Sequence, residues 1–404
     1  MDPVILPTIN TGRLLRELHY LATLTDCPPT TDATLPAPTT AVTRIVFTPR
    51  DLEARAYLTG LAEASGFSVS VDAIGNTFLR FPGTDPTLPA IGTGSHTDAI
   101  PHAGMYDGTV GVLGGLEAMR SLKESGFQPR RSIETLMFTS EEPTRFGIGC
   151  IGSRLLGGVI DPATADALPD RLPETDPQAP NGLTLHDVRT AADFTGSLDT
   201  VKLPANYYHA WVELHIEQGP LLDRENIQLG IVTNIAAPAS YRYEITGFGG
   251  HAGALLMPDR RDALCAAAEL ILSVERHTLA ANTAAGTADS VATVGTVAVH
   301  PGAVNSVPSR VTLMLDIRDT DPERREHTMA ALRADIADIQ ARRNVRIAEE
   351  RINADQPAIS SDHIVATLTS LCEANKLPII VLSMSEKGAV KKAVLGQRIG
   401  TLVA

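Results

Sequence analysis

Three short clusters of histidine and carboxylate residues have the residue types of a site for divalent cations. His96 is followed two positions later by Asp98, Asp107 stands directly before a glycine, and Glu141 and Glu142 are adjacent. A histidine can bind a cation through one ring nitrogen while the other nitrogen donates to a carboxylate. Of two neighbouring carboxylates, one can bind a cation while the other carries a proton. Together these residues predict metal-assisted hydrolysis.

Each cluster taken alone could also have an ordinary structural role. A histidine and an aspartate at this spacing are common by chance, and Asp107 could simply cap a helix. Two adjacent glutamates are found in many solvated acidic loops. The metal interpretation is favoured because the three clusters follow one another along a strand–helix–strand pattern, each where a strand gives way to a loop.

The predicted strands 90–94 and 133–138 run directly into the histidine and glutamate clusters. The apolar residues between them keep a helical period over residues 108–125, just after Asp107. A further predicted strand, 211–216, carries His215. This order predicts a mostly parallel sheet, and ligands of such sheets bind at the carboxyl ends of the strands.

Other periodic segments extend this α/β unit. They are the helices 11–24 and 51–65, the strands 67–71 and 77–81, and a short helix after Thr184. Residues 27–40 are rich in proline and threonine and are expected to form a loop.

The second half of the chain has a different order of elements. Strands are expected at 241–246, 291–299, 310–317 and 345–348, and helices at 259–277, capped by Asp259, and at 321–342. The order βαββαβ is the ferredoxin-like plan. We therefore predict an inserted domain over residues 223–351, within a catalytic domain formed by residues 1–222 and 352–404. After a helix at 362–375 and a strand at 377–382, the basic tail is expected to be irregular.

The bulk properties are those of a soluble globular protein of two domains. The 404 residues exceed the usual size of one core, and the formal net charge of −13 argues against nucleic acid or an anionic membrane surface as a partner. No apolar run reaches the roughly 18 residues of a membrane span. The four scattered cysteines favour free thiols over a zinc ribbon or disulfides. No secretory signal is visible, which favours the cytoplasm.

Six segments resemble the metal-dependent amidohydrolase branch of the M20 peptidase clan. They read GSHTDAIPHAGMYDGTVGV, TSEEPTRFG, ELHIEQGP, GGHAG, VNSVPSR and DIRD. Members of that branch hydrolyse allantoate, N-carbamoyl-L-amino acids or ureidoglycolate. The amino-acid sequences of several segments are most similar to those of the plant-type ureidoglycolate enzymes. The resemblance implies ureidoglycolate as substrate, two divalent metal ions, usually Mn²⁺ with Zn²⁺ as the alternative, and a homodimer formed through the inserted domain. It also makes the endoplasmic reticulum an alternative compartment.

The resemblance also implies roles for ten residues. One ion would be held by His96, Asp107 and His215; Asp107 would bridge to a second ion at Glu142; Asp98 would orient His96, and Glu141 would be the general base; Gln218, His251, Asn305 and Arg318 would contact the substrate. Three of the substrate residues could instead be structural. Arg318 could pair with a neighbouring aspartate, His251 could support the backbone around it, and Asn305 could be a turn residue.

The sequence departs from this family at its C-terminal end. Family members carry a further histidine there, in a Gly-x-Ser-His-like segment that completes the second metal site, and this chain has no such segment. We therefore expect an incomplete C-terminal part and weak binding of the second ion. Four hypotheses follow: a ureidoglycolate hydrolase, a sibling enzyme acting on allantoate or N-carbamoyl amino acids, a catalytically impaired form that keeps the fold, and an aminopeptidase.

Overall fold

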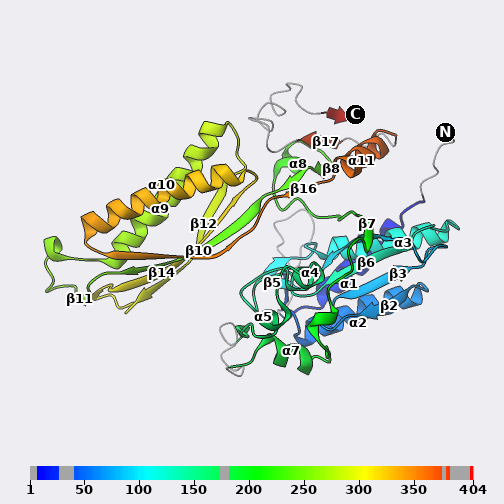
Figure 1. Cartoon of the computed structure of the whole chain (residues 1–404), viewed down its shortest axis with the longest axis horizontal. Coiled ribbons are helices and arrows are strands. Elements are labelled where there is room, and N and C mark those ends of the chain that lie inside the picture. The colour runs from blue at the N-terminus through cyan, green and yellow to red at the C-terminus, as the bar shows by residue number, and fades with distance from the viewer. Residues whose placement is uncertain (1–6, 27–40, 173–181, 375–378, 383–400, 404) are drawn as a thin grey trace. The chain divides into compact units, whose positions relative to one another are not determined.

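The computed structural model describes residues 7–26, 41–172, 182–374, 379–382 and 401–403 (Figure 1). The chain forms two compact units, residues 1–218 and 219–404. The first contains the predicted metal residues and the second contains the βαββαβ segment. The expected loop at 27–40 lies outside the described residues. The catalytic domain expected to include residues 352–404 stays a prediction. No described helix is long and apolar enough to cross a membrane.

The first unit is built on a five-stranded mixed sheet. Its strands are β2 (Ser68–Val71), β3 (Thr77–Phe81), β6 (Ile133–Phe138), β4 (Ala90–His96) and β7 (Tyr208–Trp211), in that order across the sheet. β4 runs parallel to β6 and β7, while the β2–β3 and β3–β6 pairs are antiparallel. Four of the five strands therefore run in one direction and β3 runs against them, so the expectation of a mostly parallel sheet is confirmed in part.

The antiparallel edge has a local cause. β2 and β3 are joined by a tight turn in which a side-chain oxygen of Asp72 accepts backbone N–H bonds from Ile74, Gly75 and Asn76. Gly75 has a φ of 100°, which a residue with a side chain rarely adopts. A connection this short can join only antiparallel strands, because a parallel pair needs a crossover of a dozen or more residues.

Helices bury both faces of this sheet. One face packs on α1 (Thr11–Thr23), α2 (Pro49–Ala64) and α3 (Thr109–Glu124), and the other on α4 (Ile151–Leu156) and α7 (Leu185–Ala191). Successive residues of β6 point to opposite sides, so that Met137 joins the first core and Leu136 the second. The predicted helices and strands up to residue 138 are present, and the helix after Thr184 is α7, capped by that threonine.

Several elements of the first unit were not predicted or were misplaced. β1 (Ala41–Arg44) pairs with β5 (Ala99–Gly104), and α4, α5 (Pro162–Asp166) and the 3₁₀ turn η1 (Leu198–Thr200) lie in a stretch for which only the helix after Thr184 was predicted. The strand predicted at 211–216 was wrong, because β7 ends at Trp211. The following residues leave the sheet and pass over α3, where Gly111 and Gly114 leave room for Leu214.

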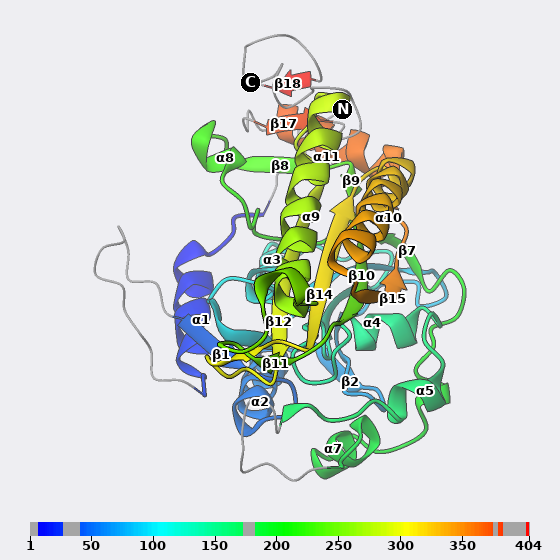
Figure 2. The same ribbon diagram turned by 90° about the vertical axis from the view of Figure 1, so that its left-hand side faces the viewer.

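The second unit contains the expected βαββαβ order. It consists of β10 (Ala237–Thr246), α9 (Ala263–Ala285), β12 (Val291–His300), β14 (Arg310–Asp319), α10 (Pro322–Arg343) and β15 (Arg346–Ala354). The strands form an antiparallel sheet in the order β12-β14-β10-β15, and both helices lie on one of its faces (Figures 1 and 2). Alternate residues of β10, such as Tyr241 and Tyr243, are fully buried beneath the helices.

Helix α9 begins later than the sequence suggested. Asp259 lies in the 3₁₀ turn η2 (Met257–Asp259), and the N-cap is Asp262, whose side chain accepts from the backbone N–H groups of Leu264 and Cys265. The chain stays extended before this cap because Arg261 forms an antiparallel bridge with Phe248. The predicted cap at Asp259 was therefore wrong by three residues.

Small elements complete the second unit. They are α8 (Leu221–Arg224), β8 (Leu229–Val232), β9 (Asn234–Ile235), β11 (Gly250–His251), β13 (Ser306–Val307), β16 (Ala358–Ile359), α11 (Asp362–Ala374), β17 (Ile379–Leu382) and β18 (Thr401–Val403). β17 runs parallel to β8 and antiparallel to β18. Of the tail after residue 382, expected to be irregular, the structure describes residues 401–403, which form β18.

Candidate metal centre

The parallel pairing of β4 and β6 brings the histidine and glutamate clusters to one edge of the sheet. His96 is the last residue of β4 and lies opposite Phe138, the last residue of β6. Glu141 and Glu142 follow three and four residues later. Carboxyl ends of neighbouring parallel strands share an edge, which explains why clusters far apart in sequence meet here.

Two groups of three potential ligands share His96. The first contains Asp107 and His215, and the second contains Glu141 and Glu142; within each group the ligand atoms lie within 4.8 Å of one another. His96 is buried, whereas His215 is exposed. The structure thus brings the five predicted metal and base residues together, four of them around the imidazole of His96.

The environment of Asp107 fits a cation. Its Oδ1 is buried without a hydrogen-bond partner and lies 3.6 Å from Nε2 of His215. Its Oδ2 accepts a hydrogen bond of 2.8 Å from the side-chain amide of Gln218. A buried carboxylate oxygen without a partner is costly, and a divalent ion between Oδ1 and the imidazole would remove that cost. Gln218, expected to contact substrate, therefore contacts a predicted metal ligand here.

Backbone contacts orient both histidines for metal binding. Nδ1 of His96 lies 2.9 Å from the carbonyl oxygen of Asp98, and Nδ1 of His215 lies 2.7 Å from the carbonyl oxygen of Ile216. Because a carbonyl only accepts, these contacts assign the proton to Nδ1 in both rings. The unprotonated Nε2 atoms, which are the atoms able to bind a cation, then face the carboxylates.

The carboxylate of Asp98 bonds to the backbone of the glutamate segment, whereas the resemblance implied that it orients the ring of His96. This carboxylate lies 3.7 Å from Nδ1 of His96, too far for a hydrogen bond, and the carbonyl of Asp98 orients the ring instead. The carboxylate accepts from the backbone N–H groups of Glu141, at 3.4 Å, and Glu142, at 3.0 Å. Asp98 therefore holds both the histidine and the glutamate segment.

Negatively charged neighbours help to raise the pKa values of two residues in the centre, Glu142 and His96. Burial, followed by the negative charge of Glu141, raises the pKa of Glu142 to about 7. Burial alone would lower the pKa of His96, but the charges of Asp98 and Glu141 outweigh it and raise that pKa. A raised pKa of a carboxyl and of an imidazole, to both of which nearby negative charge contributes, is typical of a site suited to binding a cation.

Two glycines leave space that side chains would fill. Gly108 has a φ of 64°, and a Cβ there would stand 2.6 Å from the ring of His96. Gly94 has a φ of 139°, and its Cβ would stand 2.1 Å from the carbonyl oxygen of Leu136 on β6. These contacts explain the glycines in the segments GSH and YDG in physical terms.

Two residues that contact the centre were not singled out from the sequence. The thiol of Cys150 donates to Oε1 of Glu141 at 3.3 Å, and burial, then the charge of Glu141, raises the pKa of that thiol to about 12. Arg44 is fully buried and donates to three backbone carbonyls, one of them that of Thr97 between His96 and Asp98. Cys150 lies in the segment that follows the glutamate pair, but neither residue was given a role from the sequence, and only the fold reveals these contacts.

The second unit brings two of its three predicted substrate residues together. His251 lies opposite Ser306 in the β11–β13 pair, and the carbonyl of Asn305 accepts from the N–H of Ala252. Asn305 lies just before the start of β14 at Arg310. Arg318 lies near the other end of this strand, about eight residues or 26 Å from Arg310. The structure does not place Arg318 with the other two.

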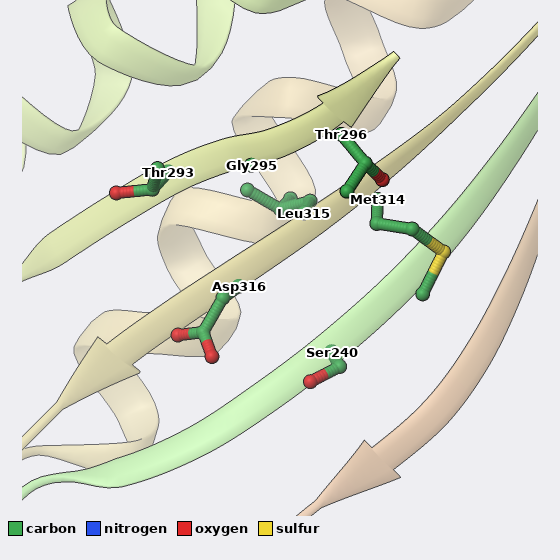
Figure 3. Close-up of a pocket in the computed structure, with 7 residues that line it drawn as sticks. All are labelled: Ser240, Thr293, Gly295, Thr296, Met314, Leu315 and Asp316. Atoms are coloured by element: carbon green, nitrogen blue, oxygen red, sulfur yellow. The ribbon is translucent and has the colours of Figure 1, made fainter. Parts of the chain in front are cut away.

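Arg318 forms the ion pair that its sequence position also allowed. Its guanidinium donates to both carboxylate oxygens of Asp316, at 2.9 and 3.2 Å. Asp316 lines a shallow depression of about 160 Å³ on the sheet, with Ser240, Thr293, Gly295, Thr296, Met314 and Leu315 (Figure 3). Asp316 and Met314 face away from the helices, since the residues alternating with them are buried in the core.

The mixed α/β fold and the histidine–carboxylate centre define a hydrolase of the metal-dependent kind. Residues 92–387 match the family described as "Peptidase family M20/M25/M40", and the chain belongs to that family. It is 44% identical over 365 residues to a ureidoglycolate hydrolase of Oryza sativa subsp. japonica, covering 89% of this chain and 71% of the relative. It is 46% identical over 333 residues to a ureidoglycolate hydrolase of Arabidopsis thaliana, covering 81% and 68%.

Other relatives share the fold. An N-carbamoyl-L-amino acid amidohydrolase of Geobacillus stearothermophilus is 36% identical over 341 residues, covering 83% of this chain and 78% of the relative. The crystal structure of AtUAH in complex with glyoxylate has a TM-score of 0.80 and 39% identity, covering 95% of this chain and 87% of that one. An amidase of the hydantoinase/carbamoylase family from Burkholderia vietnamiensis also has a TM-score of 0.80, at 31% identity, with coverage of 96% and 87%.

Proposed function

We propose that the chain hydrolyses a ureido C–N bond, with ureidoglycolate as substrate and with glyoxylate, ammonia and carbon dioxide as products. The observation that carries the hydrolysis is the position of His96 in two ligand groups, with Asp107 and His215 on one side and the glutamate pair on the other. The substrate is supported by the 44% and 46% identity to two ureidoglycolate hydrolases. Allantoate and N-carbamoyl amino acids are the substrates to compare.

The proposed metal ligands are those that the sequence predicted. His96, Asp107 and His215 would hold one ion, and Asp107 with Glu142 would hold the second. Mn²⁺ is the proposed metal and Zn²⁺ the alternative, since imidazole and carboxylate donors suit both. When bound, such ions polarise the scissile carbonyl and make water a better nucleophile. The unpartnered Oδ1 of Asp107 supports an ion at the first position.

Glu141 is the proposed general base. Its Oε2 lies 3.7 Å from Nε2 of His96, at the point where the two ligand groups meet. The carboxylate would take a proton from the attacking water and pass it to the leaving nitrogen as the C–N bond breaks, so that ammonia departs neutral. Asp98 would keep this carboxylate in place through the backbone of Glu141 and Glu142.

The second unit is the proposed source of substrate contacts and of the dimer surface. Arg318 offers a planar fork suited to the substrate carboxylate. His251 and Asn305 lie toward the other end of β14, so in the proposed dimer they would contact the ureido end of a substrate held by Arg318 of the second protomer. We also propose that residues 223–351 are an inserted lid domain and that a homodimer forms through it. Exposed apolar residues on α9 support this dimer. Leu272 and Leu279 are each 61% exposed there, beside β12 at the edge of its sheet.

Ammonia release during titration with Mn²⁺ tests the proposal. The protein is stripped with a chelator, and Mn²⁺ is added back in the presence of ureidoglycolate, allantoate or N-carbamoyl-L-alanine. Turnover that requires Mn²⁺ and is highest with ureidoglycolate is the expected result. Higher kcat/KM with one of the other two substrates would replace the substrate assignment. One bound ion per chain and no turnover with any of them would favour the catalytically impaired form.

A further inference from the structure

Cys150 contacts the proposed base, and the function described above does not use it. It is the N-cap of α4, yet its side chain makes no capping hydrogen bond to that helix. Its backbone is left-handed, with a φ of 62°, a conformation that residues other than glycine, asparagine and aspartate seldom adopt. The thiol instead donates to Oε1 of Glu141 at 3.3 Å. The side chain of Cys150 thus contacts Glu141 and does not make the hydrogen bond to the helix backbone that an N-cap side chain usually makes.

Backbone hydrogen bonds hold Cys150 in register with Glu141. The N–H of Cys150 donates to the carbonyl of Glu141 at 2.7 Å, and the next residue, Ile151, donates to the carbonyl of Ser140 at 2.9 Å. Gly149 lets the two segments approach, because a Cβ there would stand 2.7 Å from the carbonyl oxygen of Glu141. The thiol therefore meets the carboxylate because the backbone places it there.

The contact divides the two oxygens of Glu141 between different neighbours. Oε1 accepts from the thiol of Cys150, while Oε2 lies 3.7 Å from Nε2 of His96. We propose that Cys150 is a positioning residue for Glu141, whose thiol holds Oε1 so that Oε2 alone is presented to the reacting water. This inference rests on the proposed role of Glu141 as the general base. The thiol acts as a hydrogen-bond donor, and it belongs to neither group of potential ligands among the described residues.

Two substitutions of Cys150 distinguish the loss of its hydrogen bond to Glu141 from a loss of side-chain packing. Cys150→Ser keeps a donor of nearly the same size, whereas Cys150→Ala removes the donor. Misplacement of a catalytic group by about 1 Å can cost up to about a hundredfold in rate, so we expect kcat of Cys150→Ala to fall about tenfold. KM and the affinity for Mn²⁺, measured by calorimetry with MnCl₂ alone, should stay within about twofold, and Cys150→Ser should keep at least about half of kcat. Cys265→Ala, which removes an exposed thiol on α9, is the control and should match the wild type.

A readout without substrate keeps this test independent of the proposed activity. In metal-free crystals of the wild type and of Cys150→Ser, Oε1 of Glu141 should lie within hydrogen-bond distance of side chain 150. In Cys150→Ala the carboxylate should move to another rotamer or become disordered. An unmoved Glu141 with unchanged kcat would overturn the proposal, and so would a Cys150→Ser variant as impaired as Cys150→Ala. If the wild type hydrolyses none of the three ureido substrates, the proposed function fails, and the position of Glu141 in the crystals still decides the role of Cys150.

Discussion

The carboxylate of Asp98 accepts a hydrogen bond of 3.0 Å from the backbone N–H of Glu142. The same residue orients His96 through its carbonyl, so one aspartate fixes groups that come from two different strands. A side chain that accepts from two consecutive N–H groups, those of Glu141 and Glu142, fixes a loop more firmly than either bond alone would. The geometry of the proposed base therefore depends on Asp98 as well as on Cys150.

We expect Asp98→Asn to lower kcat by about a hundredfold, because the amide presents a donor where two backbone N–H groups need an acceptor. The fully buried site should also lose about 1–3 kcal/mol of unfolding free energy. Ammonia release and urea denaturation measure the two effects. Asp193→Asn is the control, since Asp193 is exposed and asparagine tolerates its left-handed backbone. Wild-type activity in Asp98→Asn would contradict the role of this carboxylate.

Glu141→Gln should reduce turnover by about 10²–10⁴-fold, the usual contribution of a general base. The metal content should stay near that of the wild type, because Glu141 is proposed to move a proton and the ions are assigned to other residues. Elemental analysis after dialysis measures the metal, and ammonia release measures turnover. Loss of metal in this variant would mean that Glu141 is a ligand and that the roles of the two glutamates are reversed.

The sequence predicted the order of the elements better than the details of the centre. Apolar periods located α1, α2, α3, α9 and α10, since each of these helices buries one face in a core. The end of β7 was misjudged, because residues 211–216 have the composition of a strand and only the glycines of α3 show why they leave the sheet. The reversed direction of β3 was not drawn from the sequence, although the short turn before it requires that direction.

Within the centre, residue types were predictable and contacts were not. The clusters around His96, Asp107 and Glu141 were found because metal chemistry needs those side chains at strand ends. The contacts of Cys150 and Arg44 could not be found, because they depend on how loops fold back on one another and leave no periodic pattern in the sequence. The pairing of Arg318 with Asp316 was foreseen as an alternative from their i, i+2 spacing on one face of a strand.

Metal binding by the stripped protein should strengthen as the pH rises toward 7. Glu142, with its pKa raised to about 7, must lose its proton to bind a cation, so Mn²⁺ and the proton compete below that pH. Above pH 7 this dependence should level off. The raised pKa also means that the metal-free protein loses this part of its stability as the pH rises from the ordinary value of 4.5 through about 7.

Calorimetry with MnCl₂ in two buffers of different ionisation enthalpy measures this competition. About one proton released as the second ion binds at pH 6, and close to none at pH 8, is the expected result. In Glu142→Gln the second ion should be lost together with most of the pH dependence. An affinity independent of pH between 5.5 and 7.5 would show that Glu142 is ionised throughout and would remove it as the titrating group.

Gly108→Ala should disrupt the first ion site. The new Cβ would stand 2.6 Å from the ring of His96, and the left-handed backbone adds about 1–2 kcal/mol of strain. Gly126→Ala is the matched control, because Gly126 also has a positive φ, of 79°, but faces open space. Thermal unfolding should show a similar strain in both variants, while only Gly108→Ala should lose Mn²⁺ binding. Equal metal binding in the two would mean that the ring of His96 can move aside.

Arg318→Ala should raise KM for ureidoglycolate about tenfold or more while changing kcat less, if its guanidinium binds the substrate carboxylate. The existing pair with Asp316 must then be exchanged for the substrate, so Asp316→Asn should leave KM unchanged or lower it. Arg310→Ala, at the other end of β14, is the control for a lost surface charge. Steady-state kinetics over a range of ureidoglycolate concentrations measure all three. If Arg318→Ala and Arg310→Ala change KM equally, the effect is general electrostatic attraction, and Arg318 does not bind the substrate carboxylate.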